Sequence, residues 1–148
     1  MIVALVILAV VALVLVVVML WVRRAVSRSQ RTLDAALAGR PLVAAENALS
    51  LGVASRGKRQ LRGSGTLALC HDRVLFVQWV PSSVLDIPFA DITGVGTTKV
   101  HLGKSVGAPL LRISWMTPDG GDEIALQVRD LDRWLAALPA AAGERDER

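Results

Sequence analysis

The stretch GTLALCHDRVLFVQWV, residues 65–80, decides the fold class because it has the form of a strand, a turn and a second strand. TLALC, residues 66–70, is an apolar run of strand length. HDR, residues 71–73, supplies a tight polar turn. VLFVQWV, residues 74–80, is almost continuously apolar, which predicts a strand in a central position of a sheet.

Further strand-like segments lie on both sides of this hairpin and are separated by turn residues. They are residues 45–55, 84–89, 91–102, 110–116 and 123–129. Pro88 confines its segment to a sheet edge or a strand end. Gly94 and Gly96 indicate a bulge in a bent strand. About seven short strands at close spacing predict a small β-barrel or sandwich.

The pattern changes to that of a helix in DLDRWLAALPAA, residues 130–141. Asp130 is a favourable N-cap residue. The large apolar residues recur at the spacing of one helix face, namely Leu131, Trp134, Leu135 and Leu138. Pro139 and Gly143 are expected to end this helix, which can plug the open end of a barrel. Trp79, Trp115, Trp134, Phe76 and Phe89 are expected to supply much of the packing.

The N-terminal segment IVALVILAVVALVLVVVMLWV, residues 2–22, contains no charge over 21 residues. A helix of that length spans about 30 Å, the thickness of a bilayer's hydrocarbon core. Trp21 suits the membrane interface. The segment therefore predicts one transmembrane helix. A cleaved signal peptide is the alternative, but no Lys or Arg precedes the run and the charged RRAVSRS follows it.

The distribution of charge predicts the orientation in the cell membrane. Four juxtamembrane residues, Arg23, Arg24, Arg28 and Arg31, follow the apolar run directly. The positive-inside rule places the short N-terminus outside and the C-terminal domain in the cytoplasm. Residues 23–62 carry a net charge of +7, whereas the residues from 63 onward carry −3. Because the basic charge is juxtamembrane, the high pI does not indicate nucleic-acid binding.

These features divide the chain into four parts. They are a transmembrane helix (1–22), a basic juxtamembrane stalk or linker (23–43), the β-rich domain (44–139) and a charged flexible tail (140–148). The first helix is expected to continue to about Leu37, because Gly39 and Pro41 then stop it.

The segment GVGTTKVHLGKS, residues 94–105, ends like a phosphate-binding P-loop. The P-loop pattern requires glycine where this chain has Thr98, and a helix after the serine. VGAP, residues 106–109, is a poor helix start. We therefore expect no nucleotide site here, and instead a hairpin turn with Lys104 at its tip.

No arrangement of residues indicates catalysis, a metal or a cofactor. His71 and His101 are the only histidines, and their spacing to the single Cys70 matches no zinc site. Cys70 is expected to be a buried apolar residue. Asp119, Asp122 and Glu123 lack the ligand spacing of a calcium loop. We expect a protein that is not an enzyme.

The basic segment RGKRQLR, residues 56–62, joins the first two predicted strands. Its cations can grip lipid phosphates or an acidic partner, and the alternative is a solvated hairpin loop. Lys99 and Lys104 can add to the same surface. The candidate contact residues are Arg56, Lys58, Arg59, Arg62, Lys99 and Lys104.

The chain resembles the pleckstrin-homology-like (PH-like) superfamily, and in particular its bacterial and GRAM-type branches. The resemblance covers residues 45–138 and consists of a glycine before a short strand, an Asp-Arg turn, an Ile-Pro-x-x-Asp-Ile motif and a final helix with Trp. The matching residues are Gly65, Asp72, Arg73, Ile87, Pro88, Asp91, Ile92 and Trp134. The resemblance implies a bent antiparallel barrel of seven strands that is capped by a C-terminal helix.

In lipid-binding members of this superfamily, the basic loop between the first two strands contacts phosphoinositide head groups. The resemblance carries that role to Lys58, Arg59 and Arg62. We therefore expect a membrane-anchored domain that engages anionic lipid head groups. The alternative is a scaffold that binds another envelope protein, for which an exposed sheet edge can accept a partner strand.

Overall fold

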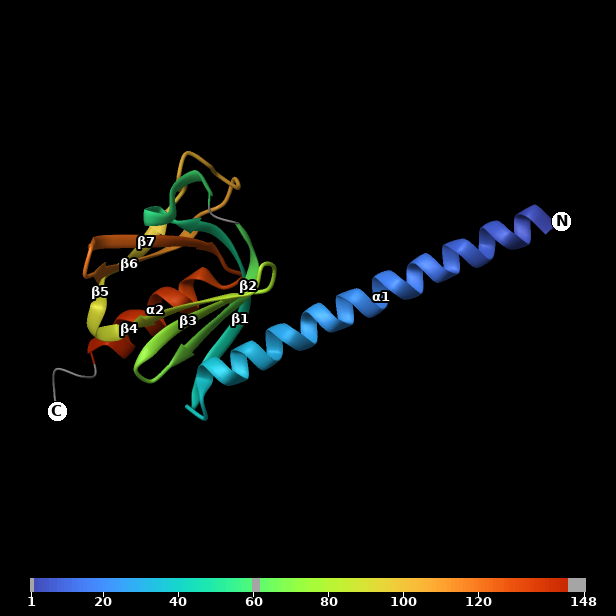
Figure 1. The fold of residues 1–148 in the computed structure, drawn as a ribbon. Coiled ribbons are helices and arrows are strands. Elements are labelled where there is room, and N and C mark those ends of the chain that lie inside the picture. Colours follow the sequence, from blue (N-terminus) through green and yellow to red (C-terminus); the bar gives the residue numbers. More distant parts are fainter. Residues whose placement is uncertain (1, 60–61, 144–148) are drawn as a thin grey trace.

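The computed structural model describes residues 2–59 and 62–143, in which a long helix, α1 (Ile2–Leu37), projects from a β-rich domain (Figure 1). The strands of the domain are β1 (Leu42–Val53), β2 (Gly63–Cys70), β3 (Arg73–Gln78), β4 (Ser83–Pro88), β5 (Ile92–Thr98), β6 (Leu110–Thr117) and β7 (Gly120–Gln127). The other elements are the 3-10 helices η1 (Ala54–Arg59) and η2 (Phe89–Asp91) and the C-terminal helix α2 (Leu131–Gly143).

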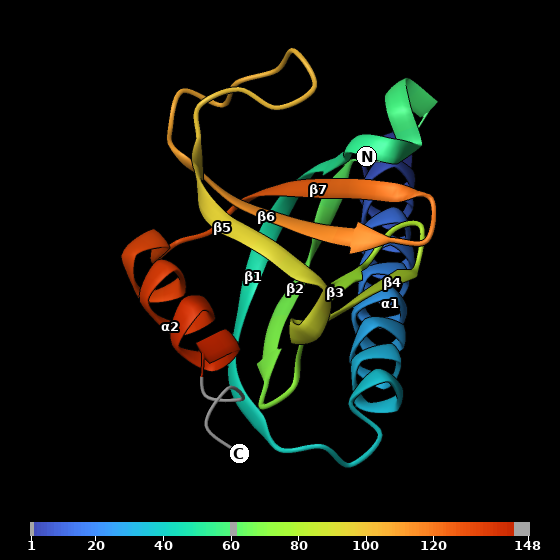
Figure 2. The ribbon, with the colours of Figure 1, turned by 90° about the vertical axis from the view of Figure 1, so that its left-hand side faces the viewer.

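The seven described strands form one antiparallel sheet in the order β4-β3-β2-β1-β7-β6-β5. β1 pairs with β2 along most of its length and with β7 near its end, so it joins the two halves of the sheet. The sheet bends strongly, so that β5 and β6 cross over β2 and β3 (Figure 2). The antiparallel barrel and the terminal helix predicted from the sequence are confirmed.

The concave side of the sheet holds the main core. Phe76, Phe89 and Trp115 are buried there, and α2 contributes Trp134 and Leu138. Trp79 is an exception among the expected core aromatics, because it is only half-buried and its indole Nε1 donates to Thr66 Oγ1 at 3.2 Å. Each aromatic side chain that enters the core removes a large apolar area from water.

Polar contacts fix the start of α2. Asp130 Oδ1 accepts a hydrogen bond from the backbone N–H of Arg133 at 3.1 Å, which confirms the predicted N-cap. Glu46 on β1 accepts from the backbone N–H of Arg129 and, at 3.1 Å, from Trp134 Nε1. The helix continues beyond Pro139 to Gly143.

The convex side of β2 and β3 is also apolar, and α1 covers it. Ala68, Cys70 and Leu75 are fully buried there against Leu33, Ala36 and Leu37, all from α1. This corrects the prediction for β3, which lies second from the sheet edge rather than centrally. Its continuous apolar run reflects a helix on its second face. Cys70 is the buried apolar residue that the sequence predicts.

Gly65 marks a close approach between β2 and β3. A Cβ atom at this position would lie 2.5 Å from the Val77 carbonyl oxygen and 2.6 Å from Cζ of Phe76. No side chain fits there without moving the backbone or the ring. Close packing therefore explains why glycine stands at position 65, before the short strand of the sequence pattern.

The segment predicted as one bent strand over residues 91–102 forms two structures. β5 ends at Thr98, with a register shift between Ile92 and Gly94. His101 and Lys104 then form an isolated bridge around a turn at Leu102 and Gly103, whose φ angles are 50° and 72°. The chain then runs into β6 without an intervening helix, unlike a P-loop.

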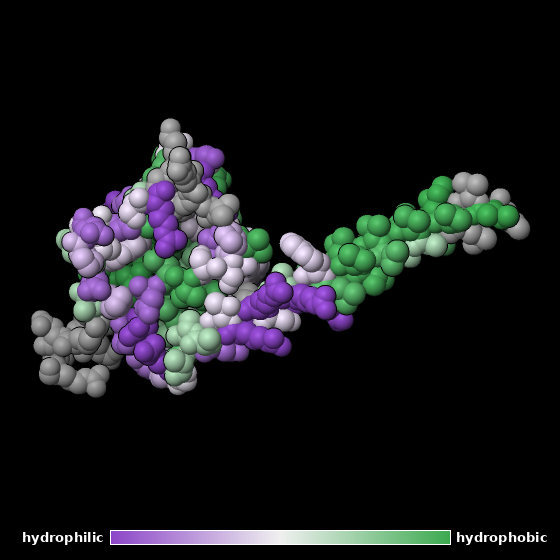
Figure 3. All heavy atoms as spheres, viewed as in Figure 1, coloured by the Kyte–Doolittle hydropathy of each residue, from purple (hydrophilic) through white to green (hydrophobic). Residues whose placement is uncertain are grey.

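α1 is the one helix among the described residues that is long and apolar enough to cross a membrane. It ends at Leu37, as predicted, and Gly39 follows with a φ of 77°. Apolar residues cover the projecting part of α1, and hydrophilic residues gather where it meets the domain (Figure 3).

Candidate functional site

Three connections surround one end of the barrel, which we call the pocket end. They are η1, the β3–β4 hairpin at residues 79–82, and the loop at residues 99–109. The first two share an end because β1 to β4 alternate in direction. The third is joined to the end of β1, since His101 Nε2 lies 2.8 Å from the carbonyl oxygen of Gly52.

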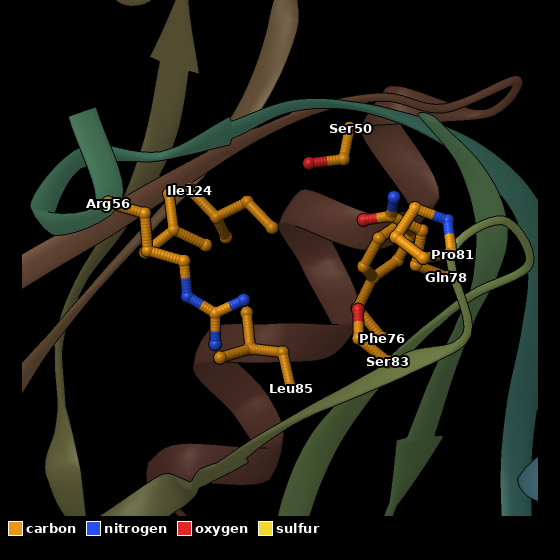
Figure 4. Close-up of a pocket in the computed structure, with 9 residues that line it drawn as sticks. Ser50, Arg56, Phe76, Gln78, Pro81, Ser83, Leu85 and Ile124 are labelled. Carbon is orange, nitrogen blue, oxygen red and sulfur yellow. The ribbon is translucent and has the colours of Figure 1, made fainter. Parts of the chain in front are cut away.

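A pocket of about 150 Å³ opens at this end (Figure 4). Its lining residues come from β1, η1, β3, β4 and β7 and are Ser50, Val53, Arg56, Phe76, Gln78, Pro81, Ser83, Leu85 and Ile124. The guanidinium of Arg56 extends across the pocket to the vicinity of Leu85 (Figure 4). The pocket thus combines an apolar floor with one cation at its mouth.

Two buried polar side chains line the same pocket. Ser50 is 4% exposed, and its Oγ accepts from the backbone N–H of Gly52 at 3.0 Å. Gln78 is 8% exposed, and its Nε2 donates to the carbonyl oxygen of Val80 at 3.1 Å. Ser50 lies on the far side of the pocket from the Arg56 guanidinium (Figure 4). Arg56 is therefore the residue of this pocket that can attract an anionic group.

The backbone that carries Arg56 is tethered to β7. The N–H and the hydroxyl of Ser55 donate to the two carboxylate oxygens of Asp122 at 2.9 and 2.6 Å. Asp122 therefore accepts hydrogen bonds within the fold, and the described residues contain no cluster suited to a metal. This contact positions the candidate cation next to the pocket, which the charge pattern alone did not reveal.

Arg62 has a structural contact. Its Nε donates to the carbonyl oxygen of Leu51 at 2.8 Å, and the side chain is partly buried. This hydrogen bond ties the residue before β2 to β1. The side chains of Lys58 and Arg59 lie outside the described residues, so their assignment to a contact surface stays a prediction.

The remaining candidate lysines lie on the neighbouring loop. Lys99 and Lys104 are exposed. His101 between them is 3% exposed, and its Nδ1 lies 3.5 Å from Glu123 Oε1. This buried imidazole anchors the loop to β1 and β7. Neither lysine is among the described residues that line the pocket. Both lie on the loop at the rim of the pocket end.

The juxtamembrane arginines are all exposed on α1. They are Arg23, Arg24, Arg28 and Arg31. Arg24 and Arg28 face the β3–β4 hairpin across a groove, whereas Arg23 and Arg31 do not line it. The docking of α1 on the sheet was not predicted from the sequence. The signal was present in Leu33, Ala36 and Leu37, which repeat at helix spacing after the charged stretch.

The direction of α1 places the pocket end relative to the apolar segment. The end of α1 packs on the C-terminal end of β2 and on the first half of β3, while residues 21–28 lie beside the β3–β4 hairpin. Following α1 toward its apolar half therefore leads toward the pocket end. The hairpin extends toward the projecting helix in Figure 1.

The opposite end of the barrel carries an ion-pair network around Arg73. Its Nη2 lies 2.9 Å from Asp72 Oδ2 and its Nη1 lies 2.8 Å from Asp86 Oδ2. The hydrogen bonds from Arg73 hold the pKa of the Asp72 carboxyl below its usual value. Burial, aided by the charge of Asp72, raises the pKa of the Cys70 thiol. These groups serve the fold, since their charges are matched to one another.

Comparison with known proteins supports the fold and leaves the function open. No protein-family model and no curated protein sequence matches the chain. A Vps36 N-terminal PH domain matches with a TM-score of 0.55 and 15% identity, over 74% of this chain and 84% of that one. The domain therefore has a PH-like fold. At this identity the likeness carries no ligand to this chain.

Two further solved structures have the same fold. The C-terminal domain of an unknown protein from Leishmania infantum matches with a TM-score of 0.56 and 14% identity, over 79% of this chain and 97% of that one. A chain of the 8S snRNP assembly intermediate matches with a TM-score of 0.53 and 14% identity, over 68% of this chain and 81% of that one. The shared region extends over most of each domain.

Proposed function

We propose that this chain is a single-pass membrane protein whose PH-like domain engages anionic lipid head groups at the membrane surface. The observation that carries the proposal is the position of Arg56. Its guanidinium lies at the mouth of a pocket on the end of the barrel toward which the apolar half of α1 leads. A membrane that holds α1 would thus meet that end.

The proposal also covers the orientation of the chain in the membrane and its action as a protein that is not an enzyme. The N-terminus is outside the cell membrane and the domain is cytoplasmic, and the support is the net charge of +7 over residues 23–62. The chain acts by binding rather than by catalysis. In support, the buried His101 is committed to Gly52 and Glu123.

The positive charge at the pocket end makes the proposed binding selective for anionic lipids. Each Lys or Arg near an anionic leaflet contributes about 1 kcal/mol of attraction. Arg56 is exposed, and no carboxylate pairs with it among the described residues. An arginine without an internal partner can form bidentate hydrogen bonds to a phosphate. The exposed Lys99 and Lys104 add attraction at the rim.

The test uses the full chain in lipid nanodiscs, because α1 covers part of the domain. Hydrogen exchange of η1 is compared in phosphatidylcholine discs and in discs that also contain phosphatidylglycerol. Wild-type η1 is expected to exchange more slowly in the anionic discs, and high salt should weaken this protection. Arg56→Gln should remove most of the lipid dependence.

Arg112→Gln is the matched control, because Arg112 is exposed on β6 and lies outside the pocket lining. It removes the same charge without changing the pocket. Equal exchange of η1 in both kinds of disc would refute the proposal. Equal effects of the two substitutions would attribute the attraction to net charge and refute the role of Arg56.

A protein-interaction scaffold for another envelope protein is the second candidate. The observation that favours it is the free side of β5, which pairs only with β6 among the described strands. A partner strand can add to such an edge. Crosslinking in cells would separate the candidates, because a scaffold should crosslink to a protein equally in Arg56→Gln.

A further inference from the structure

We infer that the groove between α1 and the β3–β4 hairpin binds the phosphate of an anionic phospholipid from the leaflet where the apolar segment ends. The groove has a volume of about 410 Å³. Trp21, Arg24, Ala25 and Arg28 line it from α1, and residues 79–82 line it from the hairpin. Its lining shares only Pro81 with that of the pocket at Arg56. The inference rests only on the membrane-spanning part of the proposed function.

The four helix residues share one face of α1, because they are spaced by three, four and seven positions. Farther along the same helix, Leu33, Ala36 and Leu37 pack on the sheet. That packing fixes one wall of the groove relative to the domain. The site therefore exists before a ligand arrives.

The hairpin wall is held by hydrogen bonds. The backbone N–H of Trp79 donates to the carbonyl oxygen of Ser64 at 3.0 Å, and its indole Nε1 donates to Thr66 Oγ1. Val80 is nevertheless 58% exposed, which is unusual for an apolar residue at a turn. Trp79, Val80 and Trp21 thus give the groove an apolar surface beside its two cations.

The depth of the groove matches the head-group layer. Trp21 is the second-last residue of the uncharged segment. At a rise of about 1.5 Å per residue, Arg24 and Arg28 lie about 4.5 and about 10.5 Å beyond it along the helix axis. The polar layer of a bilayer occupies about 5–8 Å on each side of the hydrocarbon core. The two arginines therefore bracket the level of the lipid phosphates.

The chemistry of the groove selects an anion. Arg24 and Arg28 are exposed, and neither pairs with a carboxylate among the described residues. Two planar guanidinium groups one helix turn apart can both bind the oxygens of one phosphate. A zwitterionic head group would bring a cation toward the same pair. The apolar walls suit the glycerol and the first acyl carbons of a lipid rather than a free phosphate ion.

The test measures lipid retention by the full chain. Native mass spectrometry after extraction from membranes with equal phosphatidylcholine and phosphatidylglycerol should show preferential retention of phosphatidylglycerol. Arg24→Gln/Arg28→Gln should lower this retention at least about tenfold. Arg23→Gln/Arg31→Gln, which removes the same charge outside the groove, should leave it near the wild-type level.

A second variant changes the hairpin wall instead of α1, so that its effect cannot come from α1 leaving the sheet. Val80→Glu places a carboxylate on the groove at an exposed position and should also lower retention. Equal retention by wild type, Arg24→Gln/Arg28→Gln and Val80→Glu would overturn the inference. An equal loss in Arg23→Gln/Arg31→Gln would also overturn it, because the effect would then be general juxtamembrane charge.

Two further outcomes separate other sources of binding. Added inorganic phosphate should not displace the lipid, and displacement would show a site for a free anion instead. Loss of the retained lipid in Arg56→Gln alone would move the lipid to the pocket, supporting the proposed function while overturning this inference. A chain that does not enter membranes at all would refute both.

Discussion

The two ends of the barrel use arginine in opposite ways. At one end Arg73 is held between two carboxylates, Asp72 and Asp86, and its side chain is 20% exposed. At the pocket end Arg56 is exposed, and no described carboxylate pairs with it. The first arrangement satisfies the cation within the fold, whereas the second leaves it without an ion-pair partner among the described residues, as the proposed lipid contact requires. The difference shows that the partners of a basic residue indicate its role better than its presence in a basic stretch.

α1 repeats this contrast along its own length. Its C-terminal end contributes apolar contacts to the end of β2 and the start of β3, through Leu33, Ala36 and Leu37. About one and a half to two and a half turns before these contacts, Arg28 and Arg24 line an open groove instead. Near the domain, α1 therefore packs on the sheet where it is apolar and leaves its charged groups exposed where it lines the groove.

The largest expected effect concerns the wall of the pocket end. Gly65→Ala should lower the free energy of unfolding by about 1–3 kcal/mol, because the added Cβ meets the Val77 carbonyl and the Phe76 ring. Thermal unfolding of the full chain in detergent measures this loss. Gly94→Ala is the control, since a Cβ at Gly94 meets nothing within 4 Å. An equal loss in both variants would contradict the close packing of this end.

The next effect tests the apolar contact of α1. Leu37→Asp should increase the rate at which a maleimide labels Cys70 by at least about tenfold, because it uncovers the face on which Cys70 is buried. The raised pKa of this thiol further slows its reaction in the docked state. Ala35→Asp adds the same charge to an exposed position of α1 and should leave the rate unchanged. Fast labelling of the wild type would show that α1 is not docked.

The fold was predictable because its signals are local. The turn at residues 71–73, Pro88 at the end of the edge strand β4, and the N-cap Asp130 each act on their neighbours in sequence. The contacts at the candidate site are not local. Arg62 bonds to a carbonyl 11 residues away, and Ser55 to a carboxylate 67 residues away. The sequence of a basic stretch does not show which of its cations will form hydrogen bonds within the fold and which will stay exposed.

A smaller effect compares the two kinds of arginine directly. Arg73→Gln should lower the free energy of unfolding by about 1 kcal/mol, because two partly exposed ion pairs are lost. Arg56→Gln should change it by less than about 0.5 kcal/mol, as expected for an exposed residue without an ion-pair partner. Thermal unfolding of both variants under one condition provides the measurement. A greater loss in Arg56→Gln would reverse the assignment of roles.

The smallest effect is the pH dependence of the Arg73 network. The pKa of Asp72 is lowered from 3.8 by its hydrogen bonds to Arg73, so the folded state favours the charged carboxylate. The stability that Asp72 contributes is therefore fully present above its unfolded pKa and is lost as the pH falls through its lower folded value. Because the carboxylate is well exposed, the contribution is at most about 1 kcal/mol. Asp72→Asn should unfold at a lower temperature than the wild type near pH 7, and this gap should shrink once both are measured below the folded pKa. A gap that stays constant down to that pH would show that Asp72 acts through its shape or its neutral hydrogen bonds, and the contrast between the two ends would then not be one of charge.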